Sequence, residues 1–224
     1  MNRPPILPAA NPASTLRVAS LLREGGVAVV PTDTLYGLAA SVFNEDAVRR
    51  VYAVKRRPPE KRVPVLLGSA AELTILAAPP PRVTWKLIDA FWPGALTLVL
   101  AAGRSAPKSI ARNTDTVALR VPGSRSCLEL LQSLGEPIVG TSANRSGEMP
   151  ARTAREVAAA VPEVDAVLED DSTVRLHAPS TVVKVTEGKI TILRAGVISA
   201  EQVRGVVGAA MPVEEDSYPP SLQG

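Results

Sequence analysis

Short apolar runs alternate with helical patterns along most of this chain, and this alternation limits the folds open to it. Strands are predicted by apolar-rich runs at 27–30, 63–67, 96–100, 116–121, 137–140 and 164–168. Helices are predicted over 14–24, 45–55, 82–91, 125–134 and a stretch ending at 160. Two more strand patterns, at 180–185 and 189–194, flank Glu187 and Gly188 as in a hairpin. We therefore predict one α/β domain with a mixed rather than a purely parallel sheet.

Capping and stop signals mark the ends of the predicted helices. Asn44 can cap the helix over 45–55, and Pro58 ends it together with Pro59. Three residue pairs have the spacing of a capping box, and each predicts a helix start: Ser69 with Glu72, Thr153 with Glu156, and Ser199 with Gln202.

The composition permits a substantial buried core, because 46% of the 224 residues are apolar. No run approaches the roughly 20 apolar residues that cross a membrane, and prolines interrupt the N-terminal residues where a signal peptide would be continuously apolar. We expect a cytoplasmic protein with one domain over residues 1–210. The acidic, Pro-rich tail over 211–224 is expected to be disordered.

Cysteine and histidine are too scarce for several kinds of site. The only cysteine, Cys127, lies in a helical pattern and is expected to be a small core residue, so no internal disulfide can form. The only histidine is His177, which argues against a structural zinc site. A Ser-His-Asp triad would depend on His177 alone, and no GxSxG motif accompanies it.

The run PTDTLYGL (31–38) directly follows the predicted strand 27–30 and crowds hydroxyls, a carboxylate and an aromatic ring into eight positions. Open α/β folds bind ligands at the carboxyl ends of buried strands. An ordinary polar turn would also fit this run. Two later runs of the same kind, TSANRSG (141–147) and PSTVV (179–183), favour a ligand site.

A basic cluster lies between residues 49 and 62, where seven Lys and Arg residues are opposed only by Glu60. Such a cluster is a solvated face in most proteins, but it can also bind phosphates or RNA. Lys55 and Arg57 share a side if the segment before the prolines is extended, and they could then point at one anion. A helix C-terminus also favours cations, which is the simpler explanation. Aromatic residues make up only 3% of the chain, which argues against base-stacking platforms for RNA.

Other polar groups follow predicted strands. Ser142 and Asn144 stand two positions apart, just past the strand 137–140, and suit binding of phosphate or carboxylate oxygens, although a simple turn is the alternative. Arg120 and Arg194 each end a predicted strand. A single arginine at a strand end is usually a surface charge, but these two would make a cationic cleft together with Lys55 and Arg57. There is no GxxxxGK[ST] motif, so the chain is not a P-loop protein.

Seven segments, taken in order, resemble the YrdC-like family of threonylcarbamoyl-AMP synthases over about residues 14–205. They are PTDTLYGL (31–38), KRRPPEKRVPVLL (55–67), FWPGALTLVL (91–100), DTVALRVP (115–122), PIVGTSANRSG (137–147), PSTVV (179–183) and LRAG (193–196). The resemblance implies a single α/β domain with a twisted mixed sheet, flanked by helices, around a large, positively lined cavity. Longer members carry a second, C-terminal domain, and we expect the single-domain form here.

The resemblance also implies an activity. A nucleotidyltransferase of this family would convert L-threonine, bicarbonate and ATP into threonylcarbamoyl-AMP and pyrophosphate. The product would feed threonylcarbamoyl modification of the adenosine beside the tRNA anticodon, through downstream transfer proteins. Mg²⁺ is expected to accompany ATP, with no protein metal site and no tightly bound cofactor.

The family's site residues map onto this sequence by motif. The catalytic set falls on Lys55, Arg57, Ser142 and Asn144, which would also bind ATP together with Thr116, Pro150 and Arg194. Threonine contacts fall on Thr32, Arg120, Gly140 and Ser180. Two departures stand out: the family usually has Pro or Gly at the position of Arg62, and it often has Asp-Gly-Gly and a further Gly in the loop over 169–179, which here holds Glu169-Asp170-Asp171 and His177.

Two other functions remain open at this point. A double-stranded RNA-binding or ribosome-maturation protein would use the same basic cluster, but it would hold its cations on an open, shallow face. An accessory domain without activity is the other alternative, and the retained Lys55, Arg57, Ser142 and Asn144 count against it.

Overall fold

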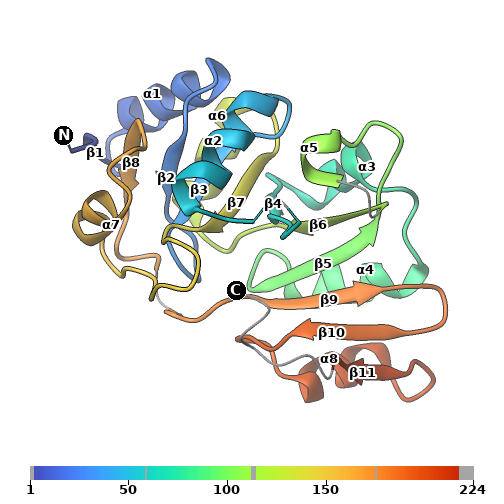
Figure 1. Ribbon diagram of the computed structural model, residues 1–224. Coiled ribbons are helices and arrows are strands. Elements are labelled where there is room, and N and C mark those ends of the chain that lie inside the picture. The colour runs from blue at the N-terminus through green and yellow to red at the C-terminus, as the bar shows by residue number, and fades with distance from the viewer. Residues whose placement is uncertain (1–2, 59, 112–114, 175, 217–224) are drawn as a thin grey trace.

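The computed structural model describes residues 3–58, 60–111, 115–174 and 176–216. Within these residues eleven strands form one sheet in the order β1-β8-β2-β3-β7-β4-β6-β5-β9-β10-β11 (Figure 1). Its neighbouring strands pair in both senses; β4 and β6, for example, are parallel, whereas β5 and β6 are antiparallel. The predicted mixed α/β sheet in a single domain is confirmed.

The strands are mostly short, and helices lie between many of them. The strands are β1 (Ile6–Pro8), β2 (Ala28–Val30), β3 (Gly37–Ser41), β4 (Val65–Leu66), β5 (Leu96–Ala101), β6 (Thr116–Arg120), β7 (Ile138–Ser142), β8 (Ala166–Glu169), β9 (Thr181–Val185), β10 (Ile190–Arg194) and β11 (Val213–Glu215). The helices are α1 (Pro12–Arg23), α2 (Glu45–Lys55), α3 (Leu73–Leu76), α4 (Arg82–Phe91), α5 (Lys108–Ala111), α6 (Arg125–Leu134), α7 (Ala154–Ala160) and α8 (Ala200–Val207), with a 3₁₀ turn η1 (Ala70–Glu72).

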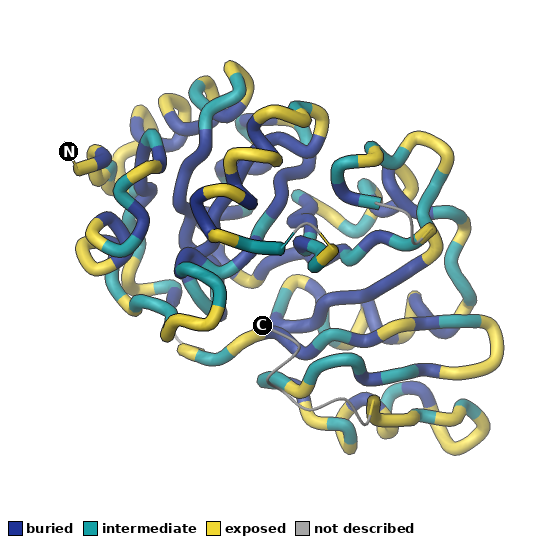
Figure 2. The backbone as a smooth tube through the Cα atoms, in the orientation of Figure 1, coloured by how far each residue is buried: buried dark blue, intermediate teal, exposed yellow. Residues whose placement is uncertain are grey.

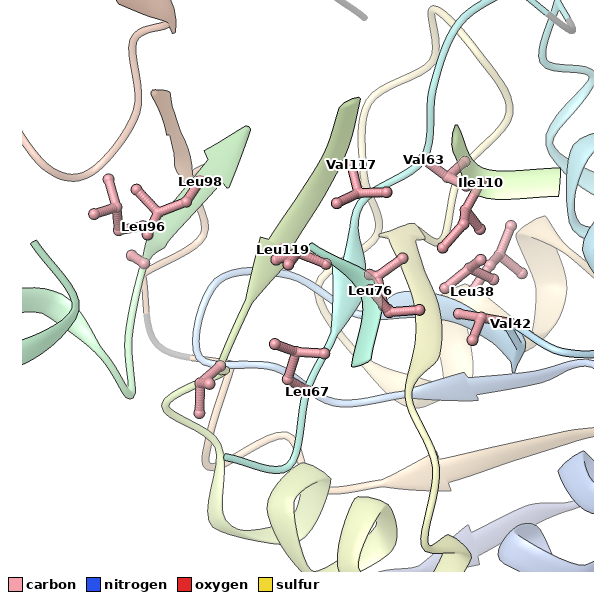
Figure 3. Close-up of a cluster of buried hydrophobic side chains, with 14 of the residues drawn as sticks. Leu38, Val42, Val63, Leu67, Leu76, Leu96, Leu98, Ile110, Val117 and Leu119 are labelled. Carbon is pink, nitrogen blue, oxygen red and sulfur yellow. The ribbon is translucent and has the colours of Figure 1, made fainter. Parts of the chain in front are cut away.

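The core consists of two apolar clusters, which lie on opposite faces of the first half of the sheet. Ala28 and Val30 of β2 pack in a cluster with α1 and α6, whereas Val29 belongs to a larger cluster on the other face. Figure 1 shows α1 and α6 together over this half. Figure 3 shows part of the larger cluster, which includes Leu38 of β3, Leu67 just after β4 and Leu119 of β6.

The second half of the sheet is covered differently. Along β9, Val183 and Val185 are buried in the larger cluster, whereas Val182 is half-buried and Lys184 is exposed. The alternation shows that one face of these strands packs on the core while the other is left partly open. Figure 2 shows the same change, from buried central strands to more exposed chain at this end of the molecule.

Most of the predicted helix signals are confirmed. The Asn44 side chain accepts from the backbone N–H of Ala47 at 2.9 Å, and capping boxes form at Thr153 and Ser199. The box predicted at Ser69 is wrong, because its side chain makes no capping hydrogen bond. Glu72 instead turns back and accepts from the N–H of Gly68 at 3.0 Å, and only a 3₁₀ turn and one short helix follow.

Three strands lie outside the predictions. Ile6–Pro8 forms β1, which pairs with β8. Gly37–Ser41 forms β3, which pairs with β2 and β7. The prediction of disorder from Met211 is wrong for Val213–Glu215, which forms β11 parallel to β10; residues 217–224 lie outside the described residues. The hairpin over 180–194 is confirmed as β9 and β10. Among the described residues, no helix combines the length and the apolarity that crossing a membrane requires.

Candidate active site

Lys55 is the last residue of α2 and is almost completely buried, with 2% of its surface exposed. Its ammonium group donates to the Ser142 carbonyl at 2.7 Å, the Ser142 hydroxyl at 3.1 Å, the Asn144 side-chain oxygen at 3.1 Å and the Asn144 carbonyl at 3.2 Å. All four acceptors are neutral. The structure therefore brings Lys55, Ser142 and Asn144 together, as predicted.

The loop after β7 is shaped to hold this arrangement. The Asn144 amide nitrogen donates to the carbonyls of Arg145 at 3.0 Å and Glu148 at 2.6 Å, so the amide oxygen faces Lys55. The N–H of Ser146 donates to the Lys55 carbonyl at 2.8 Å and so caps the end of α2. Ser142 is the last residue of β7 rather than part of the loop, and its hydroxyl can still donate its own O–H while it accepts from Lys55.

Arg57 reaches the same region by a route that differs from the extended segment we predicted. Arg56 takes a left-handed conformation, with φ of 50°, and this residue ends α2 and redirects the chain. The Arg57 guanidinium then donates to the carbonyls of Lys61 at 3.2 Å and Arg62 at 2.6 Å. These bonds use Nε and Nη2, so Arg57 fixes the loop between α2 and β4 while its Nη1 group can serve a ligand.

Arg194 ends β10, as predicted, and is held by Ser180 just before β9. Its guanidinium donates to the Ser180 carbonyl at 2.8 Å and to the Ser180 hydroxyl at 3.0 Å. That hydroxyl also lies 2.8 Å from the hydroxyl of Thr97 in β5. The sequence analysis did not select Thr97, because it stands inside an apolar strand pattern.

Lys55, Arg57 and Arg194 form what we call the unpaired cation cluster. Burial, with the positive charges of Arg57 and Arg194, lowers the pKa of Lys55 to about 7. Burial, with the charges of Arg120 and Arg57, lowers the pKa of Arg194 to about 10. Within the described residues none of the three forms an ion pair with a carboxylate. Three buried or half-buried cations that repel one another are arranged to receive an anion.

Arg120 belongs to a second group, which we call the Arg120 network. Its guanidinium donates to Asp33 Oδ1 at 2.6 Å, to the Thr34 hydroxyl at 2.9 Å and to the Gly94 carbonyl at 2.7 Å. The Thr34 hydroxyl lies 2.9 Å from that of Thr32, which also accepts from the N–H of Leu35. Burial lowers the pKa of Arg120, and the charge of Asp33 opposes that shift. Asp33 and Thr34 stand within PTDTLYGL, yet the sequence analysis assigned them no role.

The remaining predicted site residues lie around these two groups. Thr116, the first residue of β6, accepts a hydrogen bond from Arg62 through its hydroxyl. Gly140, in the middle of β7, already donates its N–H to the Pro64 carbonyl at 2.8 Å. Pro150 is half-buried beyond the Asn144 loop.

Acidic residues of the loop over 169–179, which the sequence analysis marked as a departure from the family pattern, anchor the loop to Tyr36 and to the start of α7. The Tyr36 hydroxyl donates to Asp171 at 2.6 Å and accepts from the N–H of Asp170 at 3.0 Å. Asp171 also accepts from the N–H of Ala154 at the start of α7, at 2.9 Å. Burial raises the pKa of Tyr36, so its hydroxyl remains a donor. His177 is exposed with φ of 46°, and Cys127 is fully buried, as expected.

A large, positively lined cavity remains a prediction. One hollow of about 270 Å³ borders Thr116, Lys184 and Pro79–Pro81, at the opposite end of β6 from Arg120. Within the part of the chain that the structure describes, no three His, Cys, Asp or Glu side chains are grouped so that they could hold a metal ion.

Similarity to known proteins extends over the same residues. The Sua5/YciO/YrdC family model, described as "Telomere recombination", matches residues 20–196. A threonylcarbamoyl-AMP synthase of Pyrococcus abyssi is 35% identical over 191 residues, which cover 85% of this chain and 56% of that protein. A putative threonylcarbamoyl-AMP synthase of Mycobacterium tuberculosis is 35% identical over 84% of this chain and 86% of its own length.

A solved structure agrees with these matches. The crystal structure of P. abyssi Sua5 complexed with L-threonine superposes with a TM-score of 0.87 and 30% identity, covering 95% of this chain and 62% of that one. The chain therefore spans less than two thirds of the length of the Pyrococcus proteins.

Proposed function

Because this chain belongs to the Sua5/YciO/YrdC family, we propose that it is a nucleotidyltransferase that makes threonylcarbamoyl-AMP from L-threonine, bicarbonate and ATP and releases pyrophosphate. The observation that carries this proposal is the unpaired cation cluster beside Ser142 and Asn144. The threonine-bound relative, P. abyssi Sua5, supports the choice of amino acid. The product would feed threonylcarbamoyl modification of tRNA through separate transfer proteins.

The reaction needs cations that have no other partner. The amine of threonine and bicarbonate form a carbamate with loss of water. A carbamate oxygen then attacks the α-phosphorus of ATP and displaces pyrophosphate. Both reactants are anions, so positive charge must offset their repulsion. Arg194 and the protonated form of Lys55 supply positive charge, while Arg57 and the hydroxyl of Ser142 offer donors to phosphate oxygens.

Threonine would lie at the Arg120 network. Arg120 donates to Asp33, Thr34 and the Gly94 carbonyl, which leaves part of its guanidinium fork for a carboxylate. The hydroxyl of Thr32 belongs to this network, and the hydroxyl of Ser180 lies beside Arg194. Both could form hydrogen bonds to the amino acid. Because Arg120 and Arg194 are close enough for their charges to interact, the carboxylate site and the phosphate site adjoin.

We propose that Mg²⁺ enters bound to the phosphates of ATP, where it would offset charge on the pyrophosphate that leaves. Mg²⁺ retains several waters and needs few protein ligands. Lys55, Arg57 and Ser142 would bind and orient the phosphates on the protein side.

The RNA-binding alternative fits the same residues less well. The cations of the cluster are buried or half-buried, whereas double-stranded RNA is bound by cations on an open face. Two exposed arginines of the basic stretch, Arg49 and Arg50, are neutralised by Asp46 and Asp165.

Pyrophosphate release by the purified chain tests the proposal directly. We expect release only when ATP, L-threonine and bicarbonate are all present, because each supplies a different part of the product. Omission of each substrate in turn is the control. Release at the full rate without threonine or without bicarbonate would contradict the proposal.

A further inference from the structure

Arg62 occupies a position at which the family resemblance led us to expect Pro or Gly. It stands at the end of the loop that joins α2 to β4. Arg57 holds this loop by donating to the carbonyls of Lys61 and Arg62. From there the Arg62 side chain extends to β6, where it donates to the hydroxyl of Thr116. The loop therefore adds a cation beside a residue that the family resemblance assigns to the nucleotide.

The Arg62 guanidinium uses little of its binding capacity on the part of the chain that the structure describes. One of its five N–H groups is accounted for by Thr116, a neutral acceptor. No carboxylate pairs with Arg62 in the described part of the chain. The Arg62 side chain is half-buried, and this burial lowers its pKa. A half-buried guanidinium without a carboxylate favours binding of an anion such as phosphate.

Its place along β6 indicates which part of the nucleotide it would bind. Thr116 begins β6 and Arg120 ends it, so the two residues lie about 13 Å apart along the strand. In phosphoryl transfer the attacking and leaving groups lie in line on opposite sides of the phosphorus. If the carbamate of threonine approaches from the Arg120 end, the pyrophosphate departs toward Thr116. Arg62 carries a positive charge at the Thr116 end of β6, on the side toward which the pyrophosphate would depart.

We propose that Arg62 is a further substrate-binding residue of this site, and that it binds the pyrophosphate portion of ATP and the pyrophosphate released. This inference rests on the proposed synthase function. Arg62 would bind the β- and γ-phosphates, whereas Lys55, Arg57 and Arg194 would bind the α-phosphate.

Titration of the full chain with inorganic pyrophosphate, ATP and AMP tests the assignment. Arg62→Gln is expected to weaken binding of pyrophosphate and ATP about tenfold or more, because a charge-assisted bond is lost, while AMP affinity changes less than about twofold. Arg62→Lys should recover part of the loss. The matched control is Arg56→Gln, which removes the same charge from an exposed position in the same loop.

A second variant separates direct binding from a purely structural role. If Arg62 only ties the loop to β6, Thr116→Val should weaken pyrophosphate binding as much as Arg62→Gln does. Direct binding predicts a larger loss for Arg62→Gln than for Thr116→Val. Equal losses in the two variants, or unchanged pyrophosphate binding in Arg62→Gln, would overturn the inference alone. Wild-type protein that binds neither ATP nor pyrophosphate would overturn both this inference and the proposed function.

Discussion

The unpaired cation cluster and the Arg120 network lie next to each other, but their charges are balanced in different ways. Arg120 has an internal carboxylate partner, Asp33, at 2.6 Å. Lys55 has four acceptors, and none carries a charge. The comparison teaches that the charge of Arg120 is balanced by a carboxylate within the protein, whereas no carboxylate of the described residues balances the cluster. The first should be stabilising, and the second should be costly to the fold but necessary for activity.

Arg120→Met should produce the largest effect on stability. The change leaves the Asp33 carboxylate, with 16% of its side chain exposed, without its cation. We expect the free energy of unfolding to fall by about 3–5 kcal/mol, measured by urea denaturation. Arg57→Met, which leaves no carboxylate behind, should cost about 1 kcal/mol.

The double variant Arg120→Met with Asp33→Asn serves as the control for this first prediction. It removes both charges and should recover part of the lost stability, because no isolated carboxylate remains. Equal losses for Arg120→Met and Arg57→Met would show that the two regions do not differ in the way proposed.

Lys55→Met should act mainly on turnover. It removes the ammonium group that lies beside Ser142 in the proposed phosphate site, and loss of such a group lowers turnover by roughly two to three orders of magnitude. Lys86→Met, which removes an exposed lysine of α4, should retain wild-type turnover. Pyrophosphate release under saturating substrates measures both variants. Wild-type turnover in Lys55→Met would remove this residue from the mechanism.

The binding of ATP should depend on pH through the same lysine. The pKa of Lys55 is about 7 in the free protein, and bound phosphates should raise it by favouring the charged form. The complex then takes up a proton above pH 7, so affinity should fall as pH rises, roughly tenfold between pH 7.5 and 8.5. Calorimetry across this range measures the slope. In Lys55→Met the slope should flatten, and an unchanged slope would assign the proton to another group.

The residues around Lys55 could be selected from the sequence because local signals mark them. Pro58 signals the end of the helix that carries Lys55, although Arg56 is the residue that terminates it, and Ser142 and Asn144 follow a recognisable strand pattern. The pairing of Asp33 with Arg120 could not be predicted in this way. The two residues are 87 positions apart, and only the assembled sheet brings them together.

The missed strands have a related explanation. Gly37–Ser41 consists largely of small residues with weak strand preference, and it becomes β3 because it lies between β2 and β7. Val213–Glu215 is acidic, but β11 is held through its backbone; the N–H of Asp216, just beyond it, donates to the Ile192 carbonyl at 2.9 Å. Backbone pairing of this kind leaves little trace in side-chain composition.

The smallest expected effects distinguish two hydroxyls that the sequence placed together as threonine contacts. Thr32 belongs to the Arg120 network, whereas the Ser180 hydroxyl accepts from Arg194 of the unpaired cation cluster. Thr32→Ala should therefore weaken threonine binding alone, by about 0.5–1.5 kcal/mol. Ser180→Ala should weaken threonine and ATP binding by similar amounts, because it also removes the hydroxyl that helps the Ser180 carbonyl to hold Arg194. Calorimetric titration of each variant with each ligand measures the four values, and each variant serves as the control for the other. If both variants lose affinity for threonine only, the position of Arg194 does not depend on the Ser180 hydroxyl. Ser180 would then belong with the Arg120 network rather than with the unpaired cation cluster.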